Sequence, residues 1–85
     1  MSDAERIRET VRESVNRITG IPTTDINDDS SFRDDLGLDS LSALEVMVDV
    51  EYAFKIKVGE ERLQAIQTVR DTITVVQEYL AAAKN

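Results

Sequence analysis

Ser40 is the residue whose type and position raise the question of covalent chemistry in this sequence. It follows Asp39 in the run DDLGLDSL, where a polar segment gives way to an apolar one without glycine or proline. The chain contains no histidine and no cysteine, so it lacks the usual general base and the usual thiol nucleophile. The G-x-S-x-G turn that exposes an activated serine is also missing. We therefore expect that Ser40 is not a catalytic nucleophile and that the protein is not an enzyme.

Two interpretations of Ser40 stay open on these grounds. A serine at the start of a helix is most often an N-cap, and that role needs no chemistry. A helix N-terminus also stabilises an attached anion through its free N–H groups and the helix dipole. A phosphodiester on Ser40 would fit such a position, and a modified serine could supply the reactive thiol that the sequence lacks.

The composition limits the classes of function. The chain has 85 residues and a net charge of −7, which predicts one small domain over residues 1–85. Residues 25–51 contain nine acidic residues and only one base, Arg33. This acidic centre argues against nucleic acid and favours basic protein partners. There is no apolar run long enough for a membrane span and no signal-peptide h-region at the N-terminus, so we expect a cytoplasmic location. No metal-ligand motif is complete, so we expect no bound metal. We also expect a monomer.

The apolar periodicity predicts an all-α fold. Helices are expected at residues 3–18, 40–54, 60–66 and 69–83, with capping boxes at Ser2 and Thr68. A long connection over residues 19–38 contains five apolar residues that a plain linker would not need, and we expect them to anchor it: Ile21, Ile26, Phe32, Leu36 and Leu38. The predicted architecture is a small four-helix bundle with three main helices, one short helix and a long first loop.

The helix predicted at residues 40–54 has two apolar stripes on opposite sides. The first, which we call the Val46 stripe, consists of Ala43, Val46, Met47, Val50 and Phe54. The second, which we call the Leu41 stripe, consists of Leu41, Leu44, Val48 and Tyr52. Either the helix is central and both stripes are buried, or the Val46 stripe is core and the Leu41 stripe is an exposed docking patch among carboxylates. The pattern leaves both possibilities open.

The run DDLGLDSL at residues 34–41 resembles the phosphopantetheine attachment motif of acyl carrier proteins. The preceding SFRDDLG is similar to the loop of that family, and EERLQAIQTVRDTI at residues 60–73 is similar to its short third helix and the start of its fourth. The resemblance covers nearly the whole chain. It implies that a phosphopantetheinyl transferase, with Mg²⁺ and coenzyme A, esterifies Ser40 with 4'-phosphopantetheine. The terminal thiol of that arm would hold an acyl group as a thioester for acyl-loading and acyl-processing enzymes that have basic docking patches.

The resemblance also assigns roles to individual residues. Asp39 flanks the attachment serine. Partner docking is implied for Leu41, Leu44, Glu45, Val48, Asp49 and Glu51. Lining of an acyl cavity is implied for Val46, Val50 and Phe54.

Some residues depart from the pattern of the fatty-acid carriers in this family. Ser42 replaces a frequent acid two positions after the attachment serine, and Asp49 replaces a small apolar residue. Lys55 and Lys57 stand where carboxylates are usual. We therefore expect a carrier for a dedicated pathway, to which the enzymes of primary fatty-acid synthesis dock poorly.

Three alternatives remain from the sequence. A peptidyl or aminoacyl carrier would use the same arm, but such carriers more often have Gly-Gly-His or Gly-Gly-Asp before the Ser-Leu. A calcium-binding loop could begin at Asp25, where the first positions carry oxygen ligands. It has Ser30 in place of the required glycine and Leu36 in place of the bidentate glutamate. An unmodified helical adaptor would use the Leu41 stripe for binding and Ser40 only as a cap.

Overall fold

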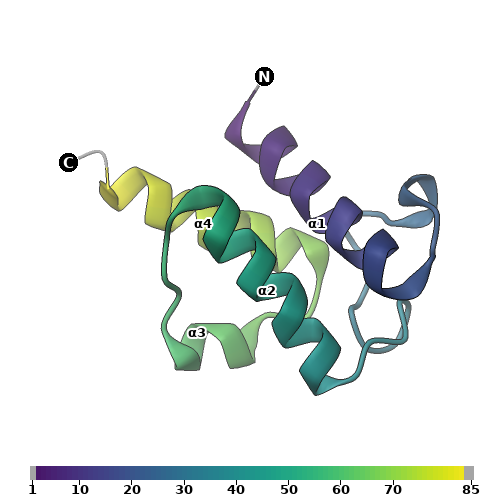
Figure 1. Cartoon of the computed structure of the whole chain (residues 1–85). Coiled ribbons are helices and arrows are strands. Elements are labelled where there is room, and N and C mark those ends of the chain that lie inside the picture. The colour runs from purple at the N-terminus through teal and green to yellow at the C-terminus, as the bar shows by residue number, and fades with distance from the viewer. Residues whose placement is uncertain (1, 84–85) are drawn as a thin grey trace.

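Four α-helices and one short 3₁₀ helix form the molecule (Figure 1). A computed structural model describes residues 2–83, so Met1 and residues 84–85 of the predicted domain lie outside the described part. The elements are α1 (Asp3–Thr19), η1 (Thr23–Asp25), α2 (Ser40–Phe54), α3 (Glu60–Ala65) and α4 (Val69–Ala83). Within residues 2–83 there is no strand, only an isolated antiparallel bridge between Ser31 and Thr68. The predicted all-α architecture is confirmed, with helix ends within about one residue of the expected ones.

The helix ends follow from local sequence. The Ser2 side chain accepts a hydrogen bond from the Glu5 amide, and Gly20, with φ of 81°, ends α1 in the left-handed conformation. At the start of α4 both halves of the predicted capping box form: the Asp71 amide donates to Thr68 Oγ1, and the Thr68 amide donates to Asp71 Oδ2. Because these contacts join residues three apart, they could be predicted before the fold was known.

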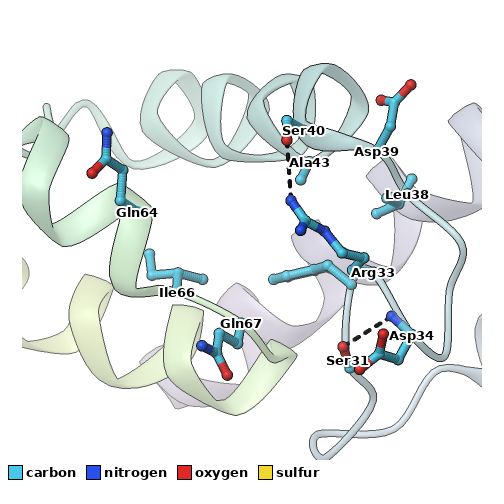
Figure 2. Close-up of a pocket in the computed structure, with 11 residues that line it drawn as sticks. Ser31, Arg33, Asp34, Leu38, Asp39, Ser40, Ala43, Gln64, Ile66 and Gln67 are labelled. Atoms are coloured by element: carbon cyan, nitrogen blue, oxygen red, sulfur yellow. Dashed lines mark hydrogen bonds between the residues drawn. The ribbon is translucent and has the colours of Figure 1, made fainter.

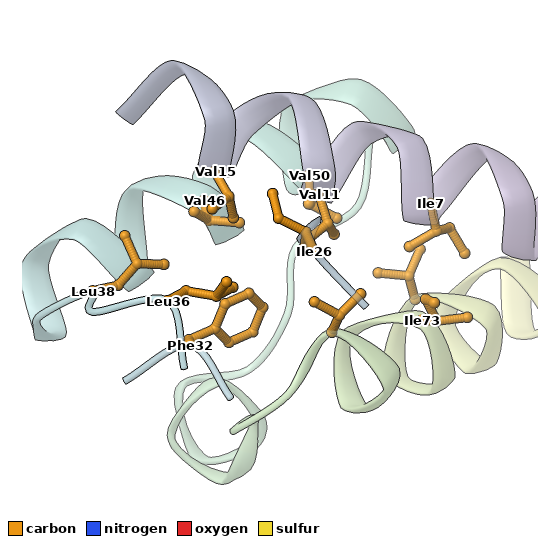
Figure 3. Close-up of a cluster of buried hydrophobic side chains, with 12 residues drawn as sticks. Ile7, Val11, Val15, Ile26, Phe32, Leu36, Leu38, Val46, Val50 and Ile73 are labelled. Carbon is orange, nitrogen blue, oxygen red and sulfur yellow. The ribbon is translucent and has the colours of Figure 1, made fainter. Parts of the chain in front are cut away.

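The core lies where α1 packs against α2 and α4 (Figure 3). The three long helices contribute side chains that are nearly or completely buried, and the long loop contributes more members of the cluster than any one helix. The members of this cluster are Ile7, Val11 and Val15 of α1, Val46 and Val50 of α2, Val69, Ile73 and Val76 of α4, and Ile26, Phe32, Leu36 and Leu38 of the loop. The expected anchoring of the loop is confirmed, except that Ile21 is only half-buried against the cluster.

Arginines of α1 and α4 hold the acidic loop in place. Arg8 donates to both carboxylate oxygens of Asp28, at 2.7 and 2.8 Å. The main-chain oxygen of Asp28 accepts from the Arg70 amide at 2.7 Å, and Arg12 Nε donates to the Ile26 carbonyl at 2.8 Å. The hydrogen bonds from Arg8 lower the pKa of Asp28. Part of the acidic surplus is thus neutralised internally rather than offered to partners.

Side chains of α4 hold the short α3 against the bundle. Tyr79 of α4 accepts a hydrogen bond from the Gly59 amide at 3.0 Å, just before α3 begins. Arg62 of α3 pairs with Glu78 of α4. A second apolar cluster under α3 consists of Met47, Val58 and Val75, with Leu63, Ile66, Ile56 and Tyr79 packed against it. Ile56 and Ile66 also pack against the main core, so this cluster joins α3 to it.

Ile26→Ala tests whether the loop belongs to the core. Ile26 has no exposed surface, so we expect the variant to lose about 3 kcal/mol of unfolding free energy from transfer and cavity formation. Ile21→Ala, at the half-buried anchor, should lose roughly 1 kcal/mol or less. Urea unfolding followed by circular dichroism measures both. Equal small losses would mean that the loop is not part of the cooperative core.

Asp28→Asn tests the pairing with Arg8 through its pH dependence. Because the folded pKa of Asp28 is lowered, the charged carboxylate stabilises the fold above the pKa that it has in the unfolded chain. That stabilisation is lost as the pH falls through the folded pKa. The wild type should therefore be more stable than the variant at neutral pH, and the difference should shrink in acid. Asp25→Asn, in the exposed part of η1, is the control. Urea unfolding across a pH series measures both differences, and a pH-independent gap for Asp28→Asn contradicts the assignment.

Candidate functional site

Ser40 is the first residue of α2, and its side chain is exposed. The N-cap of α2 is Asp39, whose Oδ1 accepts a hydrogen bond from the Ser42 amide at 2.8 Å. This bond lowers the pKa of Asp39, since it favours the charged carboxylate. The interpretation of Ser40 as a helix cap is therefore wrong: the capping role falls one residue earlier, and the Ser40 hydroxyl is not used by the helix.

The turn before α2 fixes the direction in which Ser40 leaves the loop. The Leu36 amide donates to the Ser31 carbonyl at 3.0 Å, and the Leu38 amide donates to the Phe32 carbonyl at 2.8 Å. Gly37 lies between the two buried leucines with φ of 67°, a conformation that glycine adopts without strain. Both leucine side chains enter the core, so Asp39 and Ser40 are set at the surface directly after it.

Arg33 reaches Ser40 from the same loop (Figure 2). Its Nη2 atom donates to Ser40 Oγ at 3.1 Å. Sequence reasoning counted Arg33 only as the single base of the acidic centre and missed this contact. The seven-residue separation gave no periodic signal, because the contact depends on the shape of the turn.

Two overlapping open hollows lie beside Ser40, of about 330 and about 450 Å³. Both are lined by Ser40, Arg33, Phe32, Ala43, Gln64 and Ile66. The larger hollow adds Met47 and Leu44 of α2 and Leu63 of α3, which make it the more apolar of the two. A hydroxyl at the mouth of a partly apolar hollow is a suitable place to attach a group whose far end is apolar.

The residues predicted to line an acyl cavity, Val46, Val50 and Phe54, are not among those that line the two hollows beside Ser40. Val46 and Val50 have no exposed surface and pack in the main core, and neither lines the two hollows beside Ser40. Phe54 is half-buried under the Arg6 guanidinium, about 20 Å along α2 from Ser40. The apolar α2 residues at the hollows are Ala43 and Met47, the remaining members of the Val46 stripe, and Leu44 of the Leu41 stripe. Across the larger hollow, Ala43 and Met47 face Leu63 and Ile66. The only sequence signal for these two residues was the short helix predicted at residues 60–66.

The Leu41 stripe is exposed along the outer side of α2. Its four members retain large fractions of their surface: Leu41 67%, Leu44 46%, Val48 52% and Tyr52 87%. Glu45 is exposed beside them. The alternative of a central helix with both stripes buried is therefore wrong. An apolar stripe of this kind beside a carboxylate is typical of a protein interaction surface.

Two acids that were predicted to dock partners have partners within the chain. Asp49 accepts a hydrogen bond from Ser14 and pairs with Arg17, both on α1. Glu51 accepts a hydrogen bond from the Val58 amide at 2.7 Å. Asp49 thus joins α2 to α1, and Glu51 holds the connection to α3. Of the predicted docking acids, Glu45 alone makes none of the ion pairs or side-chain hydrogen bonds found among residues 2–83.

Two lysines are exposed where α2 ends. Lys55 closes the helix in the left-handed conformation, with φ of 55°, and its amide donates to the Glu51 carbonyl. Lys57 follows two residues later. The connection that follows α2 therefore adds two exposed positive charges at this end of the helix.

Comparison with known proteins agrees with this geometry. The model of the family described as a phosphopantetheine attachment site matches residues 9–76, which include α2 and the turn before it. An acyl carrier protein of Acidothermus cellulolyticus is 37% identical over 93% of this chain and 89% of its own. One of Kineococcus radiotolerans is 33% identical over 92% and 96%. A meromycolate extension acyl carrier protein of Mycobacterium leprae is 36% identical over 87% of this chain and 64% of its own length.

No helix within residues 2–83 is both long enough and apolar enough to cross a membrane. The family match covers most of the chain, and the relatives align over nearly all of it. The chain belongs to the acyl carrier proteins, which are carriers rather than catalysts and hold acyl groups on a phosphopantetheine arm.

Proposed function

We propose that Ser40 is the residue that bears the 4'-phosphopantetheine arm and that the hollows beside it receive the acyl cargo. The observation that carries this proposal is an exposed hydroxyl without a capping role at the mouth of those hollows. The run DDLGLDSL lies within the part of the chain that the family model matches. No other serine of the chain combines that motif with such a position.

The residues around Ser40 fit a phosphodiester. The hydroxyl lies at the N-terminus of a 15-residue helix, whose free amides and dipole favour an anion. Arg33 places a guanidinium at hydrogen-bond distance from the same oxygen. When bound, the arm supplies the thiol that this chain lacks, and that thiol holds the acyl group as a thioester. The role of the chain is to anchor and expose the arm.

Attachment requires a separate transferase with coenzyme A. The Ser40 Oγ–P bond forms as the phosphoanhydride bond of coenzyme A breaks, adenosine bisphosphate leaves, and the hydroxyl proton passes to a base of the transferase. This chain has no histidine that could accept that proton. The proposal therefore assigns the catalytic groups to the partner.

The Leu41 stripe is the surface that we propose for docking of the transferase and the acyl-processing enzymes. It begins next to Ser40, so a partner that covers it also reaches the arm. Glu45 would pair with a basic residue at the edge of the partner surface. Asp49 and Glu51 are left out of this surface, because their carboxylates already have partners.

The basic end of α2 supports a carrier for a dedicated pathway. Lys55 and Lys57 would repel a partner whose basic patch extends along the whole helix, as implied for enzymes of primary fatty-acid synthesis. A partner for this protein would need an acidic or neutral surface at that end. We extend the proposal to a single domain over residues 1–85, active in the cytoplasm, where coenzyme A is available.

Ser40→Ala tests the attachment site directly. We expect the wild type, incubated with a broad-specificity phosphopantetheinyl transferase, Mg²⁺ and coenzyme A, to gain the mass of one arm, and the variant to gain none. Ser42→Ala is the matched control, since it keeps the amide that Asp39 caps and should gain the full mass. Intact-mass spectrometry gives the answer. Failure of the folded wild type to gain mass would favour an unmodified adaptor instead.

Replacing the two lysines tests pathway specificity. Lys55→Gln together with Lys57→Gln should lower the KM of a primary fatty-acid ketosynthase for the loaded carrier by about threefold, by removing exposed repulsive charges. Thr74→Glu together with Gln77→Glu makes the same change in net charge on the exposed side of α4 and should leave KM unchanged. Steady-state kinetics distinguish these outcomes. Turnover of the unaltered protein equal to that of a standard carrier would refute the hypothesis.

A further inference from the structure

We propose that Arg33 binds the phosphodiester at the base of the arm and holds it at the mouth of the hollows. This inference rests on the proposed attachment at Ser40 and adds a phosphate-positioning residue to it. Arg33 lies outside α2, on the loop whose turn also sets the place of Ser40.

The position of Arg33 is the first argument. Figure 2 shows its side chain extending from the loop toward the start of α2, with Ile66 and Gln67 on the opposite side of the hollow. Nη2 lies 3.1 Å from Ser40 Oγ, the atom that esterification would join to phosphorus. Arg33 also lines both hollows that border Ser40. Among residues 2–83, no other base contacts Ser40 or lines these two hollows.

The second argument is that Arg33, unlike four other arginines, has no carboxylate partner among residues 2–83. Arg8, Arg17, Arg62 and Arg70 each pair with a carboxylate. Arg33 makes no such pair with the described residues, although nine acids surround it in the sequence of residues 25–51.

Asp34 and Asp35, the acids nearest to Arg33 along the chain, make no ion pair with it among residues 2–83. Asp35 accepts a hydrogen bond from the Ser31 amide at 2.7 Å, and Asp39 accepts one from the Ser42 amide. Within the described part of the chain, the one side-chain hydrogen-bond partner of Arg33 is the neutral hydroxyl of Ser40. A guanidinium in an acidic region that contacts only a hydroxyl is available for an anion at that position.

Esterification changes what Arg33 faces. The hydroxyl is a weak, neutral acceptor, whereas a phosphodiester bears a negative charge on oxygens that a planar guanidinium binds in a bidentate manner. The amides at the start of α2 favour the same anion. Arg33 and the helix terminus would thus act on one group from two elements, which restricts the base of the arm more than either does alone.

The test uses the full-length protein before and after loading with the transferase. Mass spectrometry first establishes that the arm is on Ser40. In the loaded wild type we expect solvent exchange of the Arg33 Nε hydrogen to slow about threefold relative to the unloaded protein, an effect of the size that an exposed ion pair supports. The ³¹P resonance of the diester should also shift between the loaded wild type and loaded Arg33→Gln. Arg33→Lys, which keeps the charge but loses the planar fork, should shift it only part of the way.

Lys57→Gln is the matched control, because it removes the same charge from an exposed residue outside the hollows. Its ³¹P resonance should match the wild type. Absence of the mass gain would overturn both this inference and the proposed function. A normal mass gain with unchanged Arg33 exchange, or with identical ³¹P resonances in wild type and Arg33→Gln, would overturn the role of Arg33 alone and leave the carrier intact. The exchange measurement needs no variant, so it remains decisive if a substitution disturbs folding.

Discussion

Burial of the long loop in the helical core is the constraint on which the rest of the structure depends. Ile26, Phe32, Leu36 and Leu38 occupy the same cluster as the side chains of α1, α2 and α4. Because Leu36 and Leu38 are buried there, the loop has a fixed position relative to the core. The start of α2 is therefore fixed as well. A serine after an unanchored linker would have no defined relation to the hollows or to the Leu41 stripe. The loop is therefore part of the core and also the scaffold of the site.

Electrostatic pairing decides which charges this protein offers to others. The acidic centre has a large formal surplus, but Asp28, Asp29 and Asp49 pair with arginines, and Glu51 is bound by a backbone amide. The charge that a partner meets is consequently smaller than the sequence count implies. Arg33 is the reverse case, a cation within the acidic region whose only side-chain partner among residues 2–83 is neutral. The surface around Ser40 is therefore less negative than the net charge of −7 implies.

The two apolar stripes of α2 serve different purposes at different positions along the helix. The Val46 stripe fills the core with Val46 and Val50, while Ala43 and Met47 face the hollows beside Ser40. The Leu41 stripe stays exposed, although covering it would remove apolar surface from water. An uncovered stripe beside an exposed serine is what a carrier needs, since successive enzymes must bind and release the same surface. Stability of the fold is thus left to the core and the loop anchors.

The sequence by itself determined the helices, the caps at Ser2 and Thr68, the two stripes of α2 and the motif around Ser40. These features depend on residues within a few positions of one another, where periodicity and capping chemistry act without the rest of the fold. Only the tertiary structure decided which stripe is buried, that α1 contacts Asp49, and that Arg33 meets Ser40 beside a hollow that α3 borders. The physical reason is that burial and ion pairing depend on which elements pack together. A helical pattern shows that a face is apolar, but the identity of its neighbour is set by the fold.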